Sequence, residues 1–248
     1  MASKMVTDRV KSASSVTASL RTNGPQVATQ LSALFEPQLK DGETVPDVAF
    51  LFELMARHLD DKTQLMAKAD ADHLKQLGER ASAVGAREEE IEQLQEEVQA
   101  LREIVTGLYS AHIAEGIGLA GAVSDDPQEI KTKLQTVVTG LASANLGPSR
   151  VPGASLDPAE LVPSLQARLD DLNAAITVVA TEHKETSASQ TAKNKAMKDY
   201  DDTFTALAAL TEHVYRTVGE HLLARDVRPS ARRRGRTDVL DDDGGATP

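Results

Sequence analysis

The spacing of apolar residues constrains this 248-residue chain most, because it alternates between three and four positions over long stretches. Such spacing puts apolar side chains on one face of an α-helix. The clearest run lies in segment 87–108, where it forms an a/d heptad seam with charged flanks. We therefore predict a helix there that packs along another helix, in the same chain or in a partner. The seam residues are Ile91, Leu94, Val98, Leu101, Val105 and Leu108.

A second long run of this spacing follows Pro163, and no glycine or proline interrupts it before Gly219. Leu169, Leu172 and Ile176 belong to it, and we expect them to face the heptad seam. The centre, 186–193, is polar, but the apolar phase is the same on both sides of it. Because a loop has no reason to keep that phase, we predict one helix over 163–224. The alternative is two helices that meet near residue 188.

Composition favours the same fold class. Only 3% of the residues are aromatic, and the apolar residues are mainly Ala, Leu and Val. Alanine and leucine are strong helix formers, whereas strands prefer aromatic and β-branched residues. We predict an all-α, elongated antiparallel helical bundle with coiled-coil-like arms and shorter helices at one end.

Local signals mark where helices start and stop. The sequences "DPQE" and "DPAE" place Asp126 and Asp157 as N-caps before a proline, with a glutamate in the first turn. Gly24-Pro25 predicts a break before a short helix near 26–35, and Gly147-Pro148 predicts the end of the helix that Asp126 opens. "SAVGA", 82–86, is either a tight reversal or a soft spot in a continuous helix.

These signals divide the chain into three parts. We predict short N-terminal helices and a turn over 1–44, a long-helix bundle over 45–225, and a disordered charged tail over 226–248. The first 24 residues are rich in serine and contain basic residues, so they also suit a transit peptide or a weak membrane-surface helix. A short amphipathic helix that docks on the bundle is the simpler interpretation.

The sequence "EGIGLAG" contains Gly116, Gly118 and Gly121 in the G-x-G-x-x-G pattern of dinucleotide-binding loops. That loop must join a strand to a helix, and here a heptad helix precedes it. We therefore expect the glycines to allow a bend and a close backbone approach, without a nucleotide.

No catalytic, cofactor-binding or metal-binding residue is predicted. The chain has no cysteine, no nucleophile elbow, no Walker A motif and no zinc motif. Pairs such as His112 with Glu115, and Asp70 with His73, lack the spacing of helical di-metal sites. The alternative is a helical-bundle enzyme or carrier that uses His and Glu groups near Gly116–Gly121.

The net charge of −11 makes nucleic acid an improbable partner for the chain as a whole. The exception is a compact basic block in the tail, which suits an adaptor for an acidic protein partner. Its residues are Arg228, Arg232, Arg233, Arg234 and Arg236.

Together these features predict a non-enzymatic, soluble helical scaffold or assembly protein. Its protein partners, which include a second copy of itself, would bind through the helical seams. No apolar run has the length of a transmembrane span, and we expect a cytoplasmic location.

Overall fold

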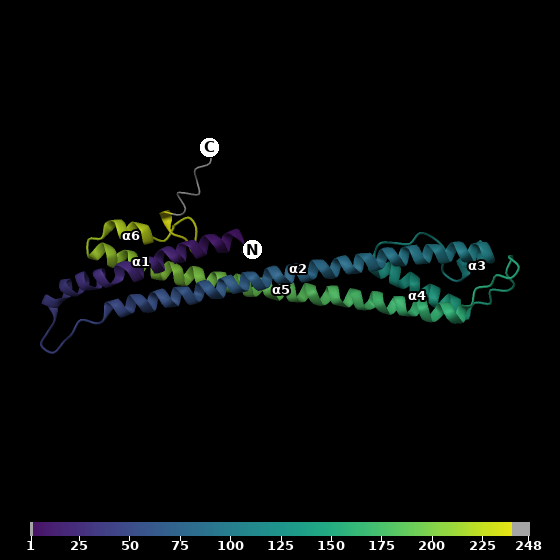
Figure 1. Cartoon of the computed structure of the whole chain (residues 1–248), viewed down its shortest axis with the longest axis horizontal. Helices are drawn as coiled ribbons and strands as arrows, with labels where there is room; N and C mark the ends of the chain where they lie inside the picture. The colour runs from purple at the N-terminus through teal and green to yellow at the C-terminus, as the bar shows by residue number, and fades with distance from the viewer. Residues whose placement is uncertain (1, 240–248) are drawn as a thin grey trace, which may run out of the picture. The chain divides into compact units, whose positions relative to one another are not determined.

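The computed structural model describes residues 2–239, and within them the chain is all-α, as predicted (Figure 1). No strand occurs in this range apart from one isolated bridge between Pro229 and Thr237. The elements are α1 (Lys4–Phe35), the short 3-10 helix η1 (Glu36–Gln38), α2 (Val48–Leu108), α3 (Ala111–Gly116), α4 (Pro127–Ser143), α5 (Pro158–Thr217) and α6 (His221–Val227).

Helix α5 is continuous through the polar centre, so the prediction of one helix is confirmed as far as Thr217. The predicted end at 224 was wrong. Gly219 takes a φ of +88°, a left-handed conformation that glycine adopts without strain, and α6 follows as a separate helix. Helix α2 likewise passes through Gly78 and Gly85 without a reversal.

The continuity of α5 predicts the effect of proline at Ala188, an exposed position in the polar centre. Ala188→Pro should destabilise the protein by about 3 kcal/mol, because proline removes a helical hydrogen bond and clashes with the preceding turn. Ala188→Gly should cost only about 1 kcal/mol. Urea unfolding followed by circular dichroism measures both. Equal stability of wild type and Ala188→Pro would show that the segment is not helical.

The break predicted at Gly24-Pro25 was wrong, because α1 continues through both residues to Phe35. Leu20 on one side of the pair and Val27 on the other are both buried in one core, which holds the helix together across the missing hydrogen bond. Gly24 lets α1 approach α2 closely. A Cβ there would lie 3.1 Å from the ring of Phe52 on α2.

Two compact units make up the chain, and they cut across the predicted division into 1–44, 45–225 and 226–248. Unit 1 comprises residues 1–75 and 187–248, and unit 2 comprises residues 76–186. Helices α2 and α5 each contribute one part to each unit. The short helices are divided between the units: α6 lies in unit 1, whereas α3 and α4 lie in unit 2. They are therefore not all gathered at one end, contrary to the prediction from sequence.

In unit 1, α1 packs against both long helices (Figure 1). Ser3 lies beside Asp70 and Gly24 beside Phe52, so α1 runs antiparallel to α2. The apolar face of α1 is buried in this core, which supports the interpretation of a docked amphipathic helix. The fully buried large side chains here are Leu20, Phe52, Leu59, Met66, Tyr200, Phe204 and Tyr215.

In unit 2, α4 and the loop before it cover the pair formed by α2 and α5. Asp126 caps α4 by accepting hydrogen bonds from the N–H groups of Gln128 and Glu129, 2.8 and 3.1 Å away, as predicted. Asp157 caps α5 through the N–H of Ala159. Helix α5 starts at Pro158 and includes Pro163, and α4 ends at Ser143, four residues before the predicted Gly147-Pro148 signal.

The prediction of a disordered tail was wrong for residues 226–239, which fold back onto α1. The N–H of Thr237 donates to Ser12 Oγ, 3.3 Å away, and Arg236 pairs with Asp8 at 2.5 Å. Gly235 has a φ of +74°, and a Cβ there would overlap the carboxylate of Asp201. Residues 240–248 of the predicted tail lie outside the described residues.

Candidate protein-interaction surface

The heptad seam closes inside unit 2. Leu94 and Val105 are fully buried, and they share one core with Leu134 of α4 and Leu172 of α5. Leu108 and Ile176 are partly buried at the edge of this core. Helix α5 and helix α4 therefore occupy the seam, and little of it is left for a partner. The other buried seam residues are Ile91, Val98, Leu101 and Leu169.

Charged residues beside the seam fix how α5 lies on α2. Arg168 pairs with Glu90 at 3.0 Å and with Glu97 at 3.1 Å, one heptad apart. With Ile91 at position a of the heptad, both glutamates fall at g positions, which flank the seam. Such pairs determine register and orientation in coiled coils, so Arg168 selects this α5 face as the intramolecular partner of the seam.

The glycine motif forms a tight loop against α4. A Cβ on Gly118 would lie 2.7 Å from Thr136 Cγ2, and one on Gly140 would lie 2.6 Å from the carbonyl oxygen of Ile117. Of the three motif glycines, the predicted close approach is present only at Gly118, because a Cβ on Gly116 or Gly121 would meet nothing within 4 Å. Arg102 donates hydrogen bonds to the carbonyl oxygen of Leu119, 2.7 Å away, and to that of Gly121, and Lys133 donates to that of Ala120. Three carbonyl groups of the loop are therefore hydrogen-bonded within the fold.

The histidine–carboxylate pairs are not assembled into a common site. His112 and Glu115 are both exposed on α3. His73 is buried and lies 3.0 Å from Ser189 Oγ, while Asp70 pairs with Lys193. Among residues 2–239, no group of three or more His, Asp or Glu side chains is arranged to hold a metal ion.

Asp70 is a buried charge that serves the fold. Its carboxylate forms an ion pair with Lys193 Nζ and accepts a hydrogen bond from the N–H of Ser3, each 2.7 Å away, and so it joins α1, α2 and α5. Burial alone would raise the pKa of Asp70, but the hydrogen bonds from Lys193 and Ser3 outweigh it and hold the pKa below its ordinary value.

This lowered pKa predicts a pH dependence of stability. The contribution of Asp70 is complete above the unfolded-state pKa of about 3.9 and is lost as the pH falls through the lower folded-state value. Wild type should therefore lose more unfolding free energy between neutral pH and pH of about 3 than Asp70→Asn does. Asp61→Asn, at an exposed position of the same helix, is the control. An identical pH profile for wild type and Asp70→Asn would contradict this role.

The predicted basic block is divided by the fold. Arg236 is tied to Asp8, and Arg228 lies 3.2 Å from Asp238 and 3.8 Å from Glu212. Arg232, Arg233 and Arg234 have exposed side chains. Acidic groups of the same chain therefore neutralise part of the positive charge that was predicted to bind an acidic partner.

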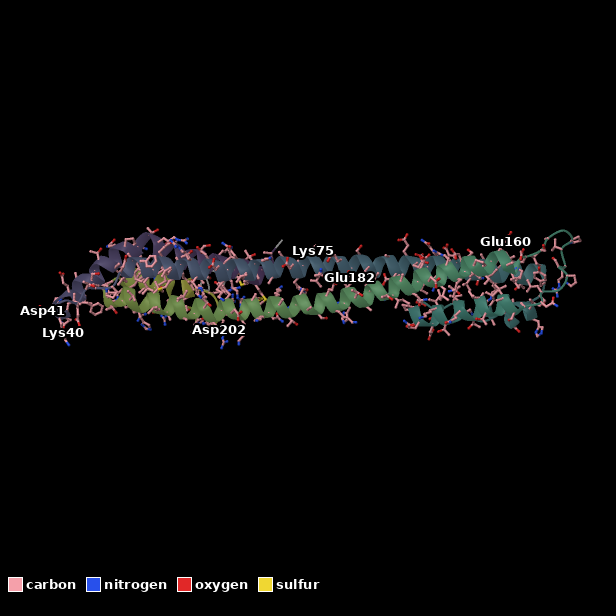
Figure 2. All side chains as sticks on the ribbon, turned by 90° about the horizontal axis from the view of Figure 1, so that it is seen from below. Lys40, Asp41, Lys75, Glu160, Glu182 and Asp202 are labelled. Atoms are coloured by element: carbon pink, nitrogen blue, oxygen red, sulfur yellow. The ribbon has the colours of Figure 1, made fainter. Side chains whose placement is uncertain are left out.

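Large apolar side chains are instead exposed around the connection between α1 and α2 in unit 1. We name these six the connection residues: Leu34, Phe35, Leu39, Phe50, Leu51 and Leu54, each between 36% and 55% exposed. Figure 2 shows this end of unit 1, where Lys40 and Asp41 are labelled.

Helical phase explains the exposure. Phe52, Met55 and Leu59 turn toward α1 and are buried, so Phe50, Leu51 and Leu54 lie on another side of α2. The sequence pattern alone did not identify these residues as a site. It does contain an indication of one, because the apolar residues of α2 occupy more than one face of the helix, and a helix that buries only one face leaves the others exposed.

No protein family, curated protein or solved structure matches this chain. No helix within residues 2–239 is long and apolar enough to cross a membrane.

Proposed function

We propose that this chain is a non-enzymatic helical scaffold that binds other proteins through the connection residues. The supporting observation is their exposure. Six large apolar side chains lie between residues 34 and 54, whereas the heptad seam is buried within unit 2. Exposed apolar surface of this kind is typical of protein-interaction sites. The cytoplasmic location stays a prediction from sequence.

The chemistry of this surface favours an amphipathic helix as the partner element. Phe50 and Leu54 are one helical turn apart and present a ridge, which suits packing against the apolar face of another helix. Charged residues surround the ridge, including Asp47 and the exposed Arg57. A polar rim around an apolar centre is the usual anatomy of a protein interface.

Site-specific photocrosslinking in the cells that naturally produce the protein tests this proposal. A photoreactive phenylalanine analogue at Leu54 should form crosslinks to a defined protein. The same analogue at Leu210, which is 47% exposed on α5 of unit 1, is the matched control. The crosslink at position 54 should disappear in the variant Phe50→Ser. Identical crosslinks from positions 54 and 210, or none from position 54, would contradict the proposal.

A further inference from the structure

A shallow groove runs between α2 and α5 in unit 1 and encloses about 320 Å³. Its apolar lining is one large side chain, Leu65, together with Ala69, Ala192 and Ala196. Leu65 is 58% exposed, so it stands beside the small alanines as a ridge beside a hollow. Such an arrangement provides both halves of a knob-into-hole contact.

Charged residues surround this groove. Three lysines and two aspartates line it, although acidic residues outnumber basic ones by 38 to 27 in the whole chain. Among the ion pairs of the described residues, none includes these five side chains. The lining charges are Lys62, Lys68, Asp72, Lys195 and Asp199.

The lining of α2 is complementary to itself. Lys62 and Asp72 lie five residues before and after Ala67, and Leu65 and Ala69 lie two residues before and after it. Two antiparallel copies of α2 related by a twofold axis at Ala67 would therefore oppose Lys62 to Asp72 and Leu65 to Ala69. A twofold axis makes each of these contacts twice.

Helix α5 fits the same axis. Asp70 pairs with Lys193 and His73 with Ser189, so the point on α5 beside Ala67 falls between Lys195 and Ala196. A twofold axis through that point brings each Lys195 within one helical turn of the other copy's Asp199. On α2 the opposite charges lie directly across the axis, whereas on α5 they lie diagonally, because the same axis sets the two Lys195 residues opposite each other.

We propose that this groove is a self-association surface, through which two copies of the chain form a twofold-symmetric dimer. The partner is a second copy because, on α2, Lys62 complements Asp72 and Leu65 complements Ala69 about one axis. The six connection residues do not line this groove. A monomeric protein would overturn this proposal and leave the proposed scaffold function standing.

Charge reversal tests the dimer. In the proposed dimer, residue 62 of each copy faces residue 72 of the other copy. The variant Lys62→Asp therefore places an aspartate opposite an aspartate at both contacts, and Asp72→Lys places a lysine opposite a lysine at both. Each variant alone should weaken self-association by about a hundredfold or more, because like charges opposed across an interface are strongly unfavourable. Sedimentation equilibrium of the full chain measures the association constant. Lys198→Asp, on the exposed surface of α5 outside the groove, should leave it unchanged.

Mixing the two variants gives the decisive result. The Lys62→Asp chain and the Asp72→Lys chain should form a heterodimer, since both opposed pairs then regain opposite charges. Within one chain the two residues lie about 15 Å apart along the helix, so an effect on folding cannot produce this rescue. A monomeric wild type, unaffected single variants or a mixture without heterodimer would each overturn the proposal. Loss of the wild-type dimer on truncation after Val239 would also overturn it, because residues 240–248 would then be required.

Discussion

Asp201→Ala should lower the free energy of unfolding by about 3–5 kcal/mol, because it leaves a buried guanidinium without its counter-ion. Asp201 accepts hydrogen bonds from Nε and Nη2 of Arg9, 2.7 and 2.9 Å away, and joins α5 to α1. The two side chains are only 13% and 10% exposed. The hydrogen bonds from Arg9 to Asp201 raise the pKa of Arg9. The arginine stays charged even after Asp201 is removed, because a guanidinium group is protonated at any pH at which the protein is folded.

The loop of residues 228–239 depends on the same pair. The hydroxyl of Tyr200 lies 2.8 Å from the carbonyl oxygen of Arg9 and 3.2 Å from that of Gly235. Burial raises the pKa of Tyr200, which keeps this hydroxyl protonated. Loss of Asp201 should therefore also loosen the contact between residue 235 and α1.

The matched control is Asp202→Ala, the adjacent exposed carboxylate labelled in Figure 2. It should change stability by less than about 0.5 kcal/mol. Arg9→Met combined with Asp201→Ala should recover part of the loss, since no buried charge is then left alone. Urea unfolding gives all three values. Equal losses for Asp201→Ala and Asp202→Ala would show that the buried pair does not stabilise unit 1.

Leu94→Ala should destabilise unit 2 by about 2–5 kcal/mol, the range for truncation of a buried leucine. Leu94 is fully buried and shares a core with side chains of α4 and α5. The control is Ile104→Ala on the same helix, where the isoleucine is 50% exposed. That change should cost much less. Similar unfolding free energies for the two variants would mean that the seam is not closed by α4 and α5.

Several features of the fold could be predicted because local physics decides them. The alternating spacing identifies helices, and aspartate before proline identifies the starts of α4 and α5. The seam residues were also placed on a face that the structure buries. Each of these signals acts over a few turns of helix and needs no knowledge of distant residues.

The remaining features depend on contacts between distant segments. The pair Gly24-Pro25 predicts a break in the helix when only neighbouring residues are considered, but α1 is continuous there and Gly24 packs against Phe52 of α2. Residues 226–239 have the composition of a tail, yet Thr237 finds its partner in Ser12, more than 200 residues earlier. The heptad pattern likewise gives no indication of whether its partner helix belongs to the same chain.

The connection residues were missed for a related reason. Sequence periodicity shows which side chains suit burial, but only the packing of α1 shows which face of α2 is covered. Phe52 and Phe50 are equally apolar, and one is 2% exposed while the other is 55% exposed. The location of an exposed apolar surface therefore requires the tertiary structure.

Amide hydrogen exchange at two protein concentrations about a hundredfold apart tests the central claim that the heptad seam is closed within the chain. Peptides covering 91–108 and 165–176 should be equally protected at both concentrations, because an intramolecular core does not respond to dilution. Peptides from 62–72 and 192–199 serve as the internal comparison, since the proposed dimer contact lies there. Loss of protection in 91–108 on dilution would contradict the account, because it would show that the seam is filled by another molecule.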